Sequence, residues 1–231
     1  FNADLVTCTN ERIADKVSKY NKNVIILPNC IPLGEQQYTE HRHESNEVRI
    51  FWAGGSTHLN DMMILKNPIK RLNTLSNIKM VLGGYTDTDQ VSKAYWDKIL
   101  SIFTNGGRLP HDKIPGTLPN NYMSHFEHAD IMVIPLEASD WHACKSNLKI
   151  LEAASKRIPC IVSNVAPYNQ DPDCPVLWVN SQKDWINHLT YLILNPDARR
   201  EMGNKLYEWA KQNYSIEAVN DRRRSAFTDL C

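Results

Sequence analysis

Short apolar runs alternate with amphipathic segments along most of the chain. Runs such as 48–53 and 131–135 are apolar at nearly every position, which is typical of strands buried on both faces of a parallel sheet. Between these runs, apolar residues recur at helical spacing. The alternation predicts an α/β fold, in which helices cover both faces of a doubly wound, Rossmann-like parallel sheet and further helices close the C-terminal end.

The same pattern gives the order of the elements. Residues 106–119 are rich in glycine and proline and are predicted to form a loop. Residues 1–30 resemble the end of a different sheet, and a linker without periodicity follows them. Strands are predicted at 5–7, 24–27, 48–53, 78–82, 131–135, 160–163 and 176–179. Helices are predicted at 11–20 with Asn10 as the cap, and at 61–75, 91–103, 121–128, 146–156, 184–194, 196–213 and 215–230.

Composition narrows the class of protein. The 231 residues contain 26 Lys and Arg against 26 Asp and Glu, so the basic excess of a nucleic-acid-binding protein is missing and no nucleic-acid partner is expected. No apolar run approaches the ~18 residues of a membrane-spanning helix, and no secretion signal is visible. We therefore expect a cytoplasmic protein with six reduced cysteines. The pairs His41/His43 and His125/His128 have no evident third ligand, so no metal site is expected.

The strongest candidate for chemistry is the segment that joins the strand at 131–135 to the helix at 146–156. Lys145, Ser146 and Asn147 stand at the start of that helix, where unpaired N–H groups attract an anion by ~0.3–1 kcal/mol. A lysine adds a charge-assisted bond of roughly 1.5–3 kcal/mol, and together these groups suit a diphosphate. Lys149 and Glu152 follow on the same helix face as Lys145, which places the Glu152 carboxylate two turns away, within reach of ribose hydroxyls.

A simpler interpretation of this segment stays open. Ser146 is then only an N-cap, and Lys149 and Glu152 form an ordinary exposed helix pair.

Two further loops follow predicted strands. Gly54 and Gly55 allow close approach of backbone to a ligand, and Thr57 or His58 donates to phosphate or sugar oxygens. The rigid loop 115–119, with Thr117 and Leu118 at its centre, holds a planar base through backbone groups. For both loops the alternative is a plain connection. The sequence contains no phosphate-binding P-loop, no GxGxxG fingerprint and no nucleophile–base pairing, so a transfer assisted by charge stabilisation is favoured over hydrolysis by a triad.

At these residues the sequence resembles the C-terminal, donor-binding half of GT-B glycosyltransferases. The similarity is to the large retaining group 1, or family 4-like, type, which includes glycogen- and sucrose-synthase-like and lipopolysaccharide enzymes, and it extends over nearly the whole chain. Four stretches carry it: 3–7 with 24–29, 49–55 with His58 and Asp61, 129–136 continuing through the Lys-Ser-x-Leu-Lys-x-Leu-Glu motif at 145–152 to Ser163, and 195–197 with the helices to Cys231.

The resemblance implies a nucleotide-diphosphate sugar as donor, transfer with retention, and no cofactor or essential metal. Glu152 matches the family's ribose-binding acid, and Lys145 and Ser146 match the positions that hold the diphosphate and the donor sugar. Cys144 stands where the family's first motif acid is expected, eight residues before Glu152. Glu137 and Asp140 are the nearby acids that could replace it.

The resemblance also implies a division of the chain. Residues 1–33 correspond to the end of an N-terminal acceptor domain, 34–47 to a linker, 48–194 to the donor-binding domain, and 195–231 to a helix pair that packs back toward the N-terminal part. The catalytic residues are unassigned and are expected partly in the missing half. That half would also bind the acceptor, which is unknown, and any membrane surface. We therefore expect an excised or truncated chain that binds donor weakly and transfers little.

Two alternatives are compatible with the sequence. One is a non-catalytic module of GT-B fold that binds a nucleotide or a glycan. The other is a GT-B enzyme similar to the nucleotide-sugar epimerases.

Overall fold

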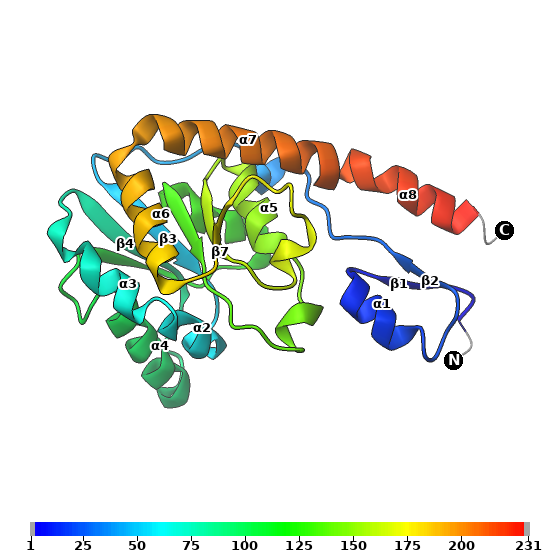
Figure 1. Ribbon diagram of the computed structural model, residues 1–231, viewed down its shortest axis with the longest axis horizontal. Coiled ribbons are helices and arrows are strands. Elements are labelled where there is room, and N and C mark those ends of the chain that lie inside the picture. Colours follow the sequence, from blue (N-terminus) through cyan, green and yellow to red (C-terminus); the bar gives the residue numbers. More distant parts are fainter. Residues whose placement is uncertain (1–2, 229–231) are drawn as a thin grey trace.

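The main body of the molecule is a six-stranded parallel sheet flanked by helices, seen in the computed structural model that describes residues 3–228 (Figure 1). The strand order is β5-β4-β3-β6-β7-β8, and every neighbouring pair is parallel. The predicted doubly wound sheet is thereby confirmed. The strands are β3 (Val48–Ala53), β4 (Ile78–Tyr85), β5 (His111–Pro115), β6 (Ile131–Ile134), β7 (Cys160–Ser163) and β8 (Leu177–Val179).

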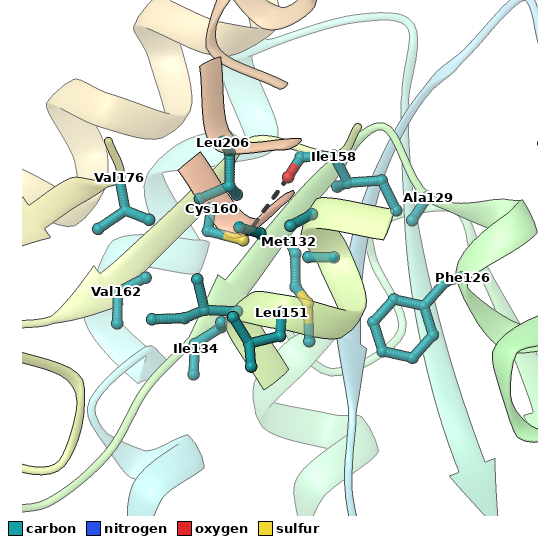
Figure 2. Packing of buried hydrophobic residues seen from close by; sticks show 14 of the residues in the cluster. Phe126, Ala129, Met132, Ile134, Leu151, Ile158, Cys160, Val162, Val176 and Leu206 are labelled. Carbon is teal, nitrogen blue, oxygen red and sulfur yellow. Dashed lines mark hydrogen bonds between the residues drawn. The ribbon is translucent and has the colours of Figure 1, made fainter. Parts of the chain in front are cut away.

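Alternate residues of each strand point to opposite faces and build two separate cores. Ile50 and Trp52 belong to one core, whereas Phe51 and Ala53 belong to the other. The first core is covered by α2 (Leu59–Met63), α3 (Lys66–Lys70), α4 (Gln90–Phe103) and α6 (Gln182–Leu194). The second is covered by α5 (Leu148–Ser155), α7 (Pro196–Tyr214) and the 3₁₀ helix η4 (Pro119–His128), and Figure 2 shows its close packing.

A small separate unit precedes the main sheet. It consists of β1 (Val6–Cys8), α1 (Glu11–Val17) and β2 (Val24–Ile26), and among the described residues its two strands pair in parallel with each other alone. The Asn10 side chain caps α1 by accepting the N–H of Ile13, as predicted. The expectation of a different sheet in this part of the chain is confirmed for β1 and β2, although α1 ends at Val17 rather than at Tyr20.

The C-terminal helices connect the two parts of the molecule. Helix α7 lies along the main sheet, and α8 (Ile216–Thr228) continues beside the N-terminal unit (Figure 1). The Arg222 guanidinium donates to the carbonyl of Ile26 at 3.1 Å, and the N–H of Ile31 donates to the carbonyl of Tyr214 at 3.1 Å. The last residues of the helix predicted at 215–230 lie outside the described residues.

Two predicted elements are wrong. The loop predicted at 106–119 contains β5, the edge strand of the sheet, because its prolines flank the strand or lie at its end, where an edge strand tolerates them. The single helix predicted at 61–75 is divided into α2, α3 and the 3₁₀ turn η3 (Arg71–Thr74). Pro68 explains the division: it lacks the N–H that a continuous helix requires, and it is tolerated only in the first turn of α3.

Candidate functional site

The predicted site lies where the order of the strands reverses. Strand β3 has β4 on one side and β6 on the other, so the loops that leave the carboxyl ends of β3 and β6 start next to each other. In open α/β sheets, ligands bind at this kind of position. Two bonds link this region. Lys149 Nζ donates to the carbonyl of Ala53 at 2.8 Å, and the N–H of Glu137 donates to Asp61 Oδ1 at 2.8 Å.

The start of α5 carries unpaired backbone donors. The helix begins at Leu148, two residues later than predicted, and Asn147 occupies the cap position without a capping side-chain bond. Instead, the buried Asn147 amide donates to Asp171 Oδ2 at 3.3 Å. Within residues 3–228 no acceptor takes the N–H groups of 146–149. The alternative in which Ser146 is only an N-cap is therefore wrong, and these amides are free to bind an anion.

Lys145 adds a positive charge at this helix start. Its ammonium forms no ion pair with any carboxylate of the described part of the chain. Its charge acts on both His58 and Lys149, and it lowers the pKa of each. Lys145 is thus an uncompensated cation beside the free amides.

Lys149 and Glu152 are packed inside the site rather than exposed as a pair. Lys149 Nζ lies 5.4 Å from the centre of the Trp52 ring, and burial lowers its pKa to about 8, although Glu152 acts in the opposite direction. Burial raises the pKa of Glu152 to about 7 against the opposing effects of Lys149 and the hydroxyl of Tyr122. That hydroxyl donates to Glu152 Oε2 at 3.4 Å. The exposed-pair alternative is wrong, and the carboxylate changes charge near neutral pH.

A buried carboxylate organises the loop after β3. Asp61 is 2% exposed and accepts a 2.6 Å bond from His58 Nδ1, and His58 Nε2 has no hydrogen-bond partner among residues 3–228. His142 Nδ1 lies 3.9 Å from Asp61 Oδ1 and donates to the carbonyl of Glu137 at 2.6 Å. Asp61 and His142 were not predicted as site residues. The i, i+3 spacing of His58 and Asp61 is a signal for the first of them, whereas nothing in the sequence indicates the second.

The electrostatics of this cluster follow from its contacts. Burial raises the pKa of Asp61, but the bonds from His58 and from the Glu137 N–H, together with His142, outweigh burial and hold the pKa below its usual range. The Asp61 bond raises the pKa of His58. Burial and the charges of Lys149 and Lys145 outweigh this bond, so the pKa of His58 is lowered.

The glycines at the strand ends are required by packing. A Cβ on Gly54 would lie 2.7 Å from the Trp52 ring and 3.3 Å from Lys149 Nζ. Gly84 has a φ of +91°, and a Cβ there would lie 2.7 Å from the carbonyl oxygen of Gly54. Thr57 is not among the atoms that crowd Gly54 and Gly84. It lines a different hollow, of about 500 Å³, together with residues of α2 and α4. A Cβ on Gly55 would meet only the Thr57 hydroxyl, at 3.8 Å.

The segment predicted to hold a base lies at the ends of β4 and β5. The Gly116 N–H donates to the carbonyl of Tyr85 at 2.9 Å, and the Thr117 hydroxyl donates to the carbonyl of Asn121 at 3.3 Å. The side chain of Leu118 is largely exposed. Tyr122, in η4 directly after this segment, donates to Glu152. The Thr117 hydroxyl lies 3.4 Å from His125 Nε2, and the His125 ring lies 5.7 Å from the ring of Tyr122. The structure therefore brings together Gly54, His58, Lys145, Lys149 and Glu152, and it links Thr117 to Glu152 through His125 and Tyr122.

Cys144 and its acidic neighbours make other contacts. The thiol of Cys144 donates to the carbonyl of Asp140 at 3.3 Å. The Asp140 carboxylate forms an ion pair with Arg12 of the N-terminal unit. Asp140 is one of the two residues that could replace the acid expected at position 144, and this ion pair already engages its carboxylate. The side chain of Glu137 is exposed, although its backbone contacts Asp61.

No helix of the described residues is both long and apolar enough to span a bilayer.

Neither a protein-family model nor a curated protein matches this sequence. Solved structures do match it in fold. Sucrose-phosphate synthase from Thermosynechococcus elongatus has a TM-score of 0.73 at 15% identity, over 99% of this chain and 59% of that chain. A glycosyltransferase from Rickettsia africae has a TM-score of 0.73 at 10% identity, over 98% and 63%. Anabaena HepE, solved in complex with UDP-glucose, has a TM-score of 0.71 at 10% identity, over 98% and 64%.

The chain spans 59–64% of the length of these three structures. Since 98–99% of this chain is covered in each comparison, the match takes in the N-terminal unit as well as the main sheet. Identities of 10–15% support a statement about fold only. The chain therefore has the fold of the GT-B glycosyltransferases, and its parallel sheet flanked by helices corresponds to the Rossmann-like domain of that architecture.

Proposed function

We propose that this chain is the donor-binding half of a glycosyltransferase that uses a nucleotide-diphosphate sugar. The observation that carries the proposal is the start of α5, where free amides at 146–149 lie beside Lys145 at the switch point of the sheet. A diphosphate matches these donors in charge and in number. The similar structures include an enzyme named as a sucrose-phosphate synthase and one solved with UDP-glucose, which supports this class of donor.

Each part of the donor has a proposed partner. The amides of Ser146 and Asn147, with Lys145, bind the diphosphate. Glu152 accepts bonds from the ribose, and the backbone at Thr117 and Leu118 faces the base. The loop with Gly54, Gly55, Thr57 and His58 approaches the diphosphate or the sugar, and Lys149 holds that loop through Ala53. The free Nε2 of His58 is a donor or an acceptor for the sugar.

The reaction proposed is transfer of the sugar to an acceptor with retention and without a cofactor. The acceptor would bind in a cleft between this half and a larger N-terminal domain. Charge stabilisation of the leaving diphosphate by Lys145 and the helix start is then the main contribution of this chain to the rate. We propose residues 1–33 as the end of that domain, 34–47 as the linker, 48–194 as the donor domain, and 195–231 as the returning helix pair.

Calorimetry with UDP-, GDP- and dTDP-linked sugars tests the proposal. We expect one of the three classes to bind the purified chain with a single site. Lys145→Ala should weaken that binding roughly 10- to 150-fold, because a charge-assisted bond contributes about 1.5–3 kcal/mol. The control is Lys211→Ala, which removes an exposed lysine from α7. No binding of any nucleotide, or equal affinity of Lys145→Ala and the wild type, would contradict the proposal.

A second candidate is a nucleotide-binding module without transfer activity. Cys144 stands in place of an acid, and Asp140 is paired with Arg12, so the acidic contacts to a donor sugar are reduced. This candidate predicts that the free nucleotide binds as tightly as the nucleotide sugar. Tighter binding of one nucleotide sugar than of its nucleotide would exclude it.

A further inference from the structure

A cluster of metal-ligating side chains lies outside the nucleotide site. We propose that His41, His43 and Glu127 bind a divalent transition-metal ion of the zinc class. One ligand atom from each residue lies within 4.8 Å of the others. The sequence offered no third ligand for the two histidines, because Glu127 reaches them only after the chain has folded.

The distances suit a small ion. Zn²⁺ binds nitrogen and oxygen at roughly 2.0–2.2 Å, which places tetrahedral ligand atoms roughly 3.3–3.6 Å apart. His43 Nε2 lies 3.5 Å from Glu127 Oε2, and His41 Nε2 lies 4.0 Å from the same oxygen. Both imidazoles are at least half exposed, so a small rotation of His41 closes the set without disturbing the core.

The surrounding contacts hold two of the three residues in place. The N–H of His43 donates to the carbonyl of Glu127 at 2.9 Å, and the ring of His128 lies 4.6 Å from the ring of His43. The two carboxylate oxygens of Glu127 have different partners. Oε1 lies 3.4 Å from the buried ammonium of Lys156, whereas Oε2 faces the histidines. A carboxylate oriented by a second partner is the arrangement that metal sites use to fix their ligands.

The donor set selects the metal. Two imidazole nitrogens and one carboxylate oxygen favour Zn²⁺, Co²⁺ or Ni²⁺ over Mg²⁺ and Ca²⁺, which prefer oxygen alone. Three protein ligands leave a position for water. The nearby charges of Lys156 and Arg49, which contact Glu127, oppose a cation, and we therefore expect micromolar rather than tighter affinity.

The position of the cluster indicates a structural role. It joins the segment before β3 to the end of η4, next to the amino ends of β3 and β6, whereas the nucleotide site lies at their carboxyl ends. An ion there would fasten the segment that leads from the N-terminal unit to the main sheet. Its binding is independent of the proposed donor site.

Zinc titration of the untagged, metal-stripped chain tests the proposal. We expect one equivalent of Zn²⁺ to bind in calorimetry, and the double variant H41Q/H43Q to lose at least tenfold in affinity. His111→Gln is the control, because His111 bonds to the carbonyl of Leu109 away from the cluster. Both variants should keep the circular dichroism spectrum and the nucleotide-sugar affinity of the wild type.

A second measurement uses the wild-type chain alone. Zn²⁺ should protect His41 and His43, but not His111, from diethyl pyrocarbonate, as read by mass spectrometry, and Mg²⁺ should protect neither. Absence of saturable zinc binding would overturn the proposal. Equal zinc affinity of H41Q/H43Q and the wild type would also overturn it, since it would assign the ion to other groups such as the thiols of Cys30 or Cys144.

Discussion

At the scale of single residues, the site combines groups whose charge depends on burial. Glu152 has a pKa of about 7 and Lys149 one of about 8, so both side chains titrate in the range where most binding measurements are made. The shift of Glu152 favours its neutral form, whereas acceptance of two ribose hydroxyl bonds favours the carboxylate. The proposed binding of ribose at Glu152 would therefore be linked to loss of a proton.

We expect this linkage to appear as pH-dependent affinity. Between pH 8 and pH 6, the affinity for a nucleotide sugar should fall by up to about tenfold, because each pH unit below the pKa reduces the ionised fraction about tenfold. Glu152→Gln should bind more weakly at pH 8 and remove this dependence. Calorimetry at four pH values measures both effects, and an equally steep profile in Glu152→Gln would assign the dependence to another group.

In the chain without nucleotide, Glu152 should make the free energy of unfolding fall as the pH rises, whereas the nucleotide affinity should rise with pH. A carboxyl group whose folded pKa is raised loses stabilising free energy as the pH rises above its unfolded pKa. Glu152→Gln should therefore increase the free energy of unfolding at pH 8 and leave it nearly unchanged at pH 4, as measured by urea titration. A variant that is less stable than the wild type at pH 8 would show that the buried carboxylate is compensated by its neighbours.

The contribution of Asp61 to the free energy of unfolding should have the opposite pH dependence to that of Glu152. Its pKa is held low, so its contribution is present above the unfolded pKa and is lost as the pH falls through the folded pKa. Asp61→Asn should lower the free energy of unfolding at pH 7 by about 2 kcal/mol, since it weakens charge-assisted bonds in a buried position. The difference should shrink below pH 4. Asp97→Asn, which removes only the exposed pair with Lys93, should change little.

At the scale of elements, the helices pack on the sheet with little free space. Helix α7 crosses the turn after α5 at Gly203, where a Cβ would lie 2.0 Å from the carbonyl oxygen of Arg157. Arg157 itself has a φ of +51° and stacks on Tyr207 of α7 at 3.9 Å. This contact fixes α7 against the second core and thereby sets the direction in which α8 leaves the main sheet.

Gly203→Ala tests how strictly that packing is required. Alanine favours a helix over glycine by about 1 kcal/mol, so propensity alone predicts a more stable chain. We expect a loss of about 1–3 kcal/mol, because the backbone carbonyl cannot move away without shifting the turn. Gln212→Ala, at an exposed position of α7, should be neutral. Chemical denaturation measures both, and a stabilised Gly203→Ala chain would show that the two elements separate easily.

At the scale of the whole molecule, the N-terminal unit contacts the loop that carries Lys145, which belongs to the proposed nucleotide site. The buried Asn10 amide donates to the carbonyl of Lys145 at 2.6 Å while its oxygen caps α1. Arg12 pairs with Asp140 in the same loop. The position of Lys145 therefore depends on a residue far away in the sequence, in a separate sheet.

Two variants of Asn10 separate its roles. Asn10→Ala removes the cap and the bond to Lys145, and should reduce both stability, by about 1 kcal/mol, and nucleotide affinity. Asn10→Asp keeps the cap acceptor but places a carboxylate against a carbonyl, so it should preserve α1 and still weaken nucleotide binding. Ser18→Ala, which removes a local bond to Asp15, is the control. Full nucleotide affinity in Asn10→Asp would show that the contact does not position Lys145.

Most of the architecture could be predicted because it depends on local pattern. Buried strands such as β3 and β7 are apolar at nearly every position, and the Ser181 and Asp184 capping box starts α6 close to the predicted residue. The edge strand β5 was not predicted from the sequence, because it carries polar residues and is bordered by proline and glycine. Its pairing with β4 comes from the neighbouring strand and not from its own sequence.

The sequence by itself determined the class of fold, the order of the layers and the segments that carry the candidate anion-binding groups, because side-chain periodicity and helix starts are local properties of the chain. Only the tertiary structure decided which groups meet. It buried Lys149 and Glu152 enough to shift their pKa values, placed Asp61 between two histidines, and brought Glu127 to His41 and His43. These outcomes depend on desolvation and on contacts between residues distant in the chain, and neither is encoded in the spacing of neighbouring residues.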